Sequence, residues 1–235
     1  IIGSEGTLAI ITSATFRITH KKSHTGTIYI PLHNKKDLEV CIREAKNKGG
    51  EKMFLYDETF MQLAQKYRQG MVPFFSETPY VLALTFSGKS EASLQEKIES
   101  YLKKIPVEAF TIKYVSGIEL FETITEKGFL FSLCEDYTRG AFSIYSGLND
   151  LVVTSPQIKE ALLDIENYLH KKGLPHILTG AIDVGNISIA LLFDKHNEHY
   201  GDTLLRVTQD ICAIIKEYKG GVSMSSGEGL MRTPF

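Results

Sequence analysis

The sequence predicts an α+β fold, in which an antiparallel sheet of ferredoxin-like character has helices packed on one face. Two observations predict it. Strand–helix–strand units occur twice along the chain, and they lack the regular strand–helix alternation of a doubly wound parallel sheet. The length of 235 residues is enough for one large domain or two small ones. The pattern leaves the order of the strands open.

The first unit alternates segments rich in β-branched residues with amphipathic segments. A helix is predicted from the N-cap Asn34 to Gly49, a second over 58–68, and a third that carries Leu94 and Ile98 on its apolar stripe. Strands are predicted at 8–12, 14–18, 27–32, 52–56, 80–86 and 107–115, of which 80–86 is continuously apolar and therefore central.

The second unit repeats this pattern approximately. Residues 118–137 form a less regular helical stretch, and strands follow at 141–145 and 151–154. Ser155-Pro156 predicts a helix start, because proline is favoured at the first helical position, and that helix ends at Gly173. A buried strand at 187–193 and a helix at 204–218 complete the unit.

The composition excludes several classes of protein. No apolar run approaches the ~20 residues that span a bilayer, so we expect no membrane span. With 28 acidic and 26 basic residues and no basic block, the chain lacks the charge pattern of a nucleic-acid binder. The three cysteines lie far apart in apolar stretches, which predicts reduced thiols and a cytoplasmic location.

A glycine-rich string opens the chain and is its most informative segment. Gly3 and Gly6 flank Ser4-Glu5, so the backbone can approach a ligand closely and offer amide and hydroxyl donors to phosphate or carbonyl oxygens. The alternative is a surface turn before a strand. The chain has no initiator Met and ends at Phe235 just after another glycine-rich loop, so we expect a fragment of a longer protein.

The full string, Gly3-Ser4-Glu5-Gly6-Thr7-Leu8-Ala9-Ile10-Ile11-Thr12, resembles the Gly-Ser-Glu-Gly-Thr-Leu-Gly-Ile-Ile-Thr string that closes the FAD-binding domain of FAD-linked oxidases. That family includes glycolate oxidase, D-lactate dehydrogenase and D-2-hydroxyglutarate dehydrogenase. The resemblance implies that residues 1–20 are the tail end of a missing FAD-binding domain and that 21–235 form the C-terminal cap, or substrate, domain, truncated at its C-terminus. It implies that FAD is bound by Gly3, Ser4, Glu5, Gly6, Thr7, Ile10 and Ile11.

The substrate end of the family pattern is altered in this chain. Where the family typically carries Gly-His-x-Gly-Asp-Gly-Asn-x-His, this chain has Gly180-Ala181-Ile182-Asp183-Val184-Gly185-Asn186-Ile187-Ser188, without either histidine. Ser225 and Ser226 stand where the later Ser-x-Glu-His-Gly-x-Gly pattern has Glu and His. In metal-using members those residues hold a divalent cation, so we expect no metal here. The resemblance leaves Asn186, Ser225, Ser226 and Arg232 to bind the substrate.

Two further pairs of candidates come from the residues alone. Asp183 and Glu228 lie in glycine-containing loops and would act as a general base if the loops converge; the alternative is exposed loop carboxylates. His196 and His199 could share a helical face and bind a metal, although such a string is more often a solvated loop.

The resemblance implies an FAD-dependent oxidoreductase that acts on the CH–OH group of small 2-hydroxy acids such as glycolate or D-lactate, with the fragment inactive alone. Its expected partners are its own N-terminal FAD-binding domain, the substrate, and an electron acceptor or iron–sulfur subunit. One alternative is a catalytically silent relative that serves as a binding or interaction module. A generic ferredoxin-like regulatory domain is another, but it does not explain the opening string.

Overall fold

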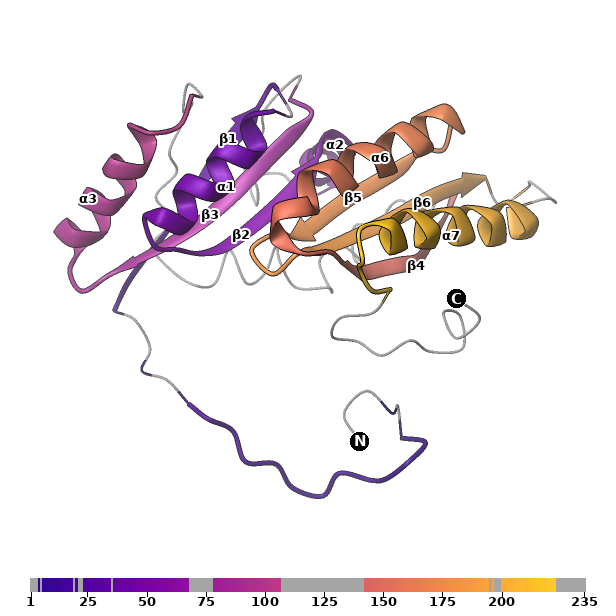
Figure 1. Ribbon diagram of the computed structural model, residues 1–235, viewed down its shortest axis with the longest axis horizontal. Helices are drawn as coiled ribbons and strands as arrows, with labels where there is room; N and C mark the ends of the chain where they lie inside the picture. The colour runs from indigo at the N-terminus through magenta and orange to yellow at the C-terminus, as the bar shows by residue number, and fades with distance from the viewer. Residues whose placement is uncertain are drawn as a thin grey trace.

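A computed structural model describes residues 4, 6–18, 20, 23–34, 36–67, 78–106, 142–194, 196 and 200–222. Its strands form one six-stranded sheet in the order β1-β3-β2-β5-β6-β4, in which every neighbouring pair is antiparallel (Figure 1). The strands are β1 (His24–Leu32), β2 (Gly50–Asp57), β3 (Tyr80–Gly88), β4 (Phe142–Val152), β5 (His176–Ala181) and β6 (Asn186–Asp194). The helices are α1 (Asp37–Asn47), α2 (Glu58–Tyr67), α3 (Glu91–Leu102), α6 (Ile158–Lys171) and α7 (Tyr200–Glu217), with a 3-10 turn at Ser155–Gln157.

The sheet consists of two halves with the same arrangement. In the first half the order β1-β3-β2 places the third strand between the other two, and in the second half β5-β6-β4 does the same. Each half is a strand, a helix, two strands and a helix in chain order, apart from α2 in the first half. The halves join where β2 pairs with β5. The repeat predicted from the sequence is therefore confirmed.

Each face of the sheet carries its own hydrophobic core. The apolar stripes of α1, α3, α6 and α7 pack on one face, against alternate strand residues such as Ile28, Leu55 and Leu82. The intervening residues, among them Tyr56 and Val81, form a second core with α2 on the other face. Figure 1 shows the four helices in front of the sheet and α2 behind it.

The predicted α+β class is confirmed, but the expectation that helices pack on one face holds for four of the five described α-helices. The exception, α2, lies on the opposite face because β2 and β3 are apolar on both sides. The ring of Tyr56 stacks on Phe60 of α2 with centroids 4.7 Å apart, and Phe60, Met61 and Ala64 are buried there. A continuously apolar strand needs cover on both faces.

Several predicted boundaries differ from the structure. The strands predicted at 141–145 and 151–154 form one strand, β4, and β5 was not predicted. Asn34 does not cap α1 directly; its Oδ1 accepts a hydrogen bond from the Lys36 amide at 3.0 Å, and the helix begins at Asp37. The predicted strand 107–115 and helical stretch 118–137 lie outside the described residues.

The N-terminal segment runs away from the sheet (Figure 1). The strands predicted at 8–12 and 14–18 do not form, because a strand needs a neighbour to receive its backbone hydrogen bonds. Large apolar side chains are consequently exposed along it: Leu8 (75%), Ile10 (89%), Ile11 (63%), Phe16 (80%) and Ile18 (88%). Among the described residues, no helix has the length and apolar character required to cross a membrane.

Candidate functional site

The turn between β5 and β6 lies within Gly180–Ser188, the segment in which this chain lacks both histidines of the family pattern. We call it the substrate-end turn. Gly185 has φ +81°, a left-handed conformation that residues with a Cβ rarely adopt. A Cβ at this position would lie 1.9 Å from the Val153 carbonyl oxygen, and the Val153 amide donates to the Gly185 carbonyl at 2.9 Å. The glycine therefore lets the turn lie directly on the end of β4.

Asn186 and Ser188 point from β6 toward a buried aspartate in β4. The side-chain nitrogen of Asn186, Nδ2, donates to Asp150 Oδ1 at 3.0 Å and to the Leu151 carbonyl at 3.4 Å. The Ser188 hydroxyl accepts from the Asp150 amide at 3.3 Å. Asp150 is only 3% exposed and has φ +70°, a strained conformation that aspartate tolerates better than most residues. Sequence reasoning missed it, although Asn149-Asp150 interrupting an apolar strand was a usable signal.

Asp183 is half-buried, and its carboxyl lies against the junction of the two halves. Its Oδ1 accepts a long hydrogen bond, 3.4 Å, from the Met53 amide of β2. Burial raises the pKa of this carboxyl, while hydrogen bonds from the amides of Met53, Asp183 and Val184, and the charge of Lys46, act in the opposite direction. The carboxyl is thus bonded to backbone rather than presented to solvent.

The glycine pair after α7 reaches the same end of β4. Gly221 and Val152 exchange two backbone hydrogen bonds, of 2.8 and 2.9 Å, next to the Val153–Gly185 contact. The β5–β6 turn and the segment before residue 223 therefore meet on consecutive residues, Val153 and Val152, at the end of β4. Ser225, Ser226, Glu228 and Arg232, which were predicted to act here, lie outside the described residues.

A second buried aspartate closes the far end of the β2–β5 junction. Asp57 Oδ1 accepts from the Phe60 amide and Oδ2 from the Leu178 amide, both at 2.7 Å, so one carboxyl joins β2, α2 and β5. Burial raises the pKa of Asp57 to about 8, the two amides oppose that shift, and the charges of Glu166 and Glu58 reinforce it. The sequence showed it only as a polar residue between a strand and a helix.

The opening string forms a turn that is separate from the sheet. The Thr7 amide and hydroxyl both bond the Ser4 carbonyl, at 2.9 and 2.6 Å, and Gly6 has φ +80°. Apart from its own chain neighbours, no atom of the described residues lies within 4 Å of the position of a Gly6 Cβ, so this side of the turn has room for a bound group. Such an open, positive-φ glycine turn fits close approach of a flavin. Gly3 and Glu5 lie outside the described residues.

The histidine pair shows no metal-site geometry in the part that is described. His196 is exposed and its backbone amide donates to Asp194 Oδ1 at 2.9 Å, which is a local turn contact; His199 lies outside the described residues. Across the described ranges, no group of three or more His, Cys, Asp or Glu side chains could hold a metal ion.

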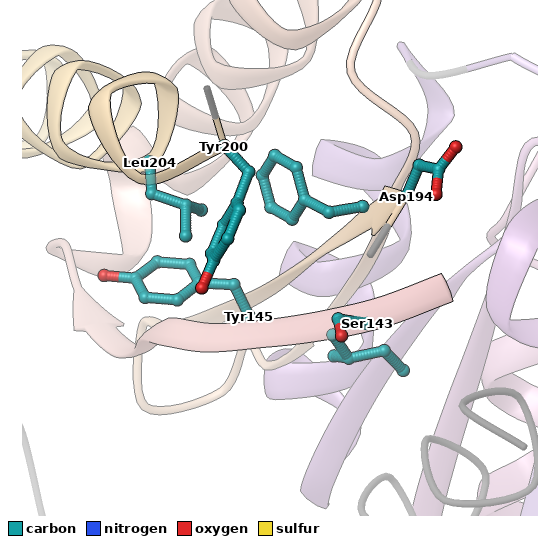
Figure 2. Close-up of a pocket in the computed structure, with 7 residues that line it drawn as sticks. Ser143, Tyr145, Asp194, Tyr200 and Leu204 are labelled. Atoms are coloured by element: carbon teal, nitrogen blue, oxygen red, sulfur yellow. The ribbon is translucent and has the colours of Figure 1, made fainter. Parts of the chain in front are cut away.

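A cavity of about 290 Å³ lies at the opposite end of β4 from the substrate-end turn. In Figure 2 the ring of Tyr200 lies close to the ring of Tyr145 and to the aliphatic side chain of Leu204, whereas the Asp194 carboxylate points away from them. The Tyr145 hydroxyl is hydrogen-bonded to Thr208 of α7 at 3.2 Å. The lining residues are Ser143, Ile144, Tyr145, Phe193, Asp194, Tyr200 and Leu204, none of which belongs to the turn.

Comparison with known protein families shows to which family the chain belongs. The sequence model of the family described as "FAD linked oxidases, C-terminal domain" matches residues 22–235. The chain belongs to this family. The predicted resemblance is thereby confirmed, and with it FAD as the cofactor of the full-length protein.

Solved structures show the same fold. Two structures of alkyldihydroxyacetonephosphate synthase align with TM-score 0.55 and 16% identity, over 93% of this chain and 44% of theirs. A 4-ethylphenol oxidase from Gulosibacter chungangensis, in complex with isoeugenol, aligns with TM-score 0.57 and 11% identity, over 85% of this chain and 45% of its own. The chain thus spans less than half the length of these proteins. No curated protein matches its sequence significantly.

Proposed function

We propose that the full-length protein is an FAD-dependent oxidoreductase that oxidises the CH–OH group of a small 2-hydroxy acid, with this chain as the cap over the substrate. Its partners are its own N-terminal FAD-binding domain and an electron acceptor such as an iron–sulfur subunit. We place the protein in the cytoplasm, on the basis of its cysteines, of which Cys41 is buried and free.

One observation carries this proposal. The segment that resembles the flavin-lining string has its glycine turn open on one side, and the residues after it expose five large apolar side chains. Exposed apolar runs of this kind mark interaction surfaces. An FAD-binding domain that supplies strand partners for residues 8–18 would bury them and would bring Gly6 to the flavin.

The chemistry divides between the cofactor and this chain. Bound FAD would supply the two-electron oxidant for the CH–OH group, and this chain would supply the groups that hold the substrate and take up its hydroxyl proton. From this chain, Arg232 would hold the substrate carboxylate, since a guanidinium binds carboxylates in a bidentate manner. Ser225 and Ser226 would complete the substrate contacts, whereas the side-chain amide of Asn186 is bonded to Asp150 and to the Leu151 carbonyl. Because Asp183 is bonded to Met53, Glu228 is the carboxyl of the two that we assign as the base.

The deciding experiment is anaerobic titration of the purified full-length protein with glycolate and D-lactate, followed by flavin absorbance. We expect bound flavin that is bleached by a 2-hydroxy acid, at a rate that chelator leaves unchanged. Arg232→Ala should raise KM at least tenfold, whereas Arg206→Ala, an exposed arginine of α7, should not. A metal-dependent rate would contradict our expectation that the chain binds no divalent metal and would direct attention to His196 and His199.

A catalytically silent binding module is the second candidate. It is favoured by the loss of both histidines, since Ala181 has no polar group and the Ser188 hydroxyl is bonded to the Asp150 amide. A full-length protein that purifies without flavin would support this candidate over the oxidoreductase.

A further inference from the structure

The cavity between β4 and the start of α7 is far from the substrate-end turn. It is lined by Ser143 and Tyr145 near the beginning of β4, whereas the turn contacts Val153, directly after the end of that strand. From Tyr145 to Val153 is roughly 25 Å along an extended strand. A small molecule in the cavity therefore cannot touch the turn, so the two places are separate.

The inner end of the cavity is closed by a contact between α7 and β4. The Tyr145 hydroxyl is hydrogen-bonded to the hydroxyl of the buried Thr208 at 3.2 Å. Phe193 of β6, the register partner of Ser143, is also buried and lines the cavity from the sheet side. These walls belong to the hydrogen-bonded and packed part of the fold, so a ligand need not open the core to enter.

The outer end of the cavity is formed by the first turn of α7. Tyr200 and Leu204 are four positions apart, so both project from the same side of the helix. Figure 2 shows the ring of Tyr200 beside the ring of Tyr145. Tyr200 is 47% exposed, which makes this end accessible from solvent.

The side chains that line the cavity favour an uncharged aromatic molecule. The rings of Tyr145, Phe193 and Tyr200 can stack on a ligand ring or contact its edge. Among the described residues, no lysine, arginine or histidine lines the cavity, and the carboxylate of Asp194 points away from the tyrosine rings (Figure 2). A ligand carboxylate or phosphate would therefore lose hydration without gaining a counter-ion. The half-buried Ser143 offers one hydroxyl, which suits a ligand with a single polar group.

The volume of the cavity limits the ligand to a ring with a short substituent. An apolar cavity of about 150 Å³ holds benzene, and this cavity has about 290 Å³. We propose that the cavity between β4 and α7 is a second ligand site, which binds an uncharged phenol of one ring. The site is independent of the proposed oxidation, because a 2-hydroxy acid carries the carboxylate that this lining disfavours.

The test measures binding of 4-methylphenol to the full-length protein by a ligand-observed NMR titration. We expect saturable binding with a Kd of about 0.1–1 mM, as is reasonable for a ligand of so few atoms. The comparison ligand is 4-hydroxybenzoate, which has the same ring and hydroxyl but carries a carboxylate at neutral pH. It should bind at least about tenfold more weakly.

Two variants of α7 locate the site. Leu204→Trp fills the cavity with an indole and should weaken binding at least about tenfold. Tyr200→Ala removes a half-exposed ring and should weaken binding about three- to tenfold, with the fold retained. Leu205→Trp is the matched control, because Leu205 is the next residue of the same helix, is 50% exposed and is not among the described residues that line the cavity. It should bind 4-methylphenol as wild type does.

Three results would overturn the inference. They are no saturable binding of 4-methylphenol across the millimolar range, equal binding of 4-hydroxybenzoate, and variants at Leu204 and Tyr200 that bind like Leu205→Trp. The last result would place the phenol elsewhere in the full-length protein. If Leu204→Trp does not fold, Tyr200→Ala and the comparison of the two ligands still decide. Reduction of the flavin by 2-hydroxy acids is measured separately, so failure of either proposal leaves the other standing.

Discussion

The two halves of the sheet share a strand order but differ where the second strand connects to the third. In the first half, β2 leads into α2, which covers the back of the sheet with Phe60 and Met61. In the second half, β5 reaches β6 through residues 182–185 alone. The longer connection builds a second core. The short one leaves no room for a core and instead places a rigid turn on the end of β4.

The halves are joined by a short ladder with an aspartate at each end. Only three register pairs connect β2 and β5, against nine between β1 and β3. At one end Asp57 of the first half accepts from the Leu178 amide, and at the other Asp183 of the second half accepts from the Met53 amide. The junction thus depends on side-chain acceptors more than the strand pairs within each half do.

The largest expected effect comes from adding a methyl group to the turn of the second half. Gly185→Ala would place its Cβ against the Val153 carbonyl in a positive-φ conformation, so we expect a loss of more than about 3 kcal/mol of unfolding free energy. Gly173 also has a positive φ, +64°, but apart from its chain neighbours no described atom lies within 4 Å of an added Cβ. Gly173→Ala should therefore lower the unfolding free energy by only about 1–2 kcal/mol. Urea denaturation of the two variants compares them, and equal losses would show that the turn can move away from β4.

The next effect concerns the junction and depends on pH. Asp57→Asn replaces one acceptor by a donor that faces a backbone amide, so it should cost about 1–3 kcal/mol. The folded-state pKa of Asp57, about 8, lies above the unfolded value of about 4, so folding favours the protonated carboxyl. The contribution of this group is therefore fully present below about pH 4 and is lost as pH rises toward about 8. Denaturation between pH 4 and 9 should show this decline in wild type but not in Asp57→Asn.

A smaller loss of unfolding free energy is expected when the contact with Asp150, the buried aspartate of the second half, is removed. Asn186→Ala removes the side-chain amide that donates to Asp150 and should lower the unfolding free energy by about 1–2 kcal/mol. Asn34→Ala, in the exposed connection that follows β1, removes one contact with the Lys36 amide and should cost less than about 1 kcal/mol. If thermal unfolding ranks the two variants the other way, Asp150 does not depend on Asn186.

The smallest effect should come from the ion pair between helices of the two halves. Lys159 Nζ of α6 lies 2.6 Å from Glu39 Oε2 of α1, and both groups are at the surface. Exposed pairs of this kind are screened by water and salt. Lys159→Ala should therefore change the unfolding free energy by little more than the error of the measurement, and any change should vanish in high salt. A larger loss would mean that the helices, rather than the β2–β5 ladder, join the halves.

The sequence by itself determined the α+β class, the duplicated unit and the family, because apolar periodicity and a glycine string are local properties of the chain. It predicted most helices within a few residues, since α1, α3, α6 and α7 each carry a single apolar stripe. It failed at residues 8–18, whose composition is that of a strand but which pair with none of the strands that the structure describes.

The tertiary structure alone decided the face of α2, the order of the strands and the surroundings of the substrate-end turn. Helical periodicity shows that α2 has an apolar side but not which face of a sheet it covers. Asp57, Asp150 and Asp183 are ordinary polar residues in the sequence, and each acquires its role from amides or side chains more than 30 residues away, at Leu178, Asn186 and Met53. Contacts between distant segments form only when the strands pair, so no local pattern encodes them.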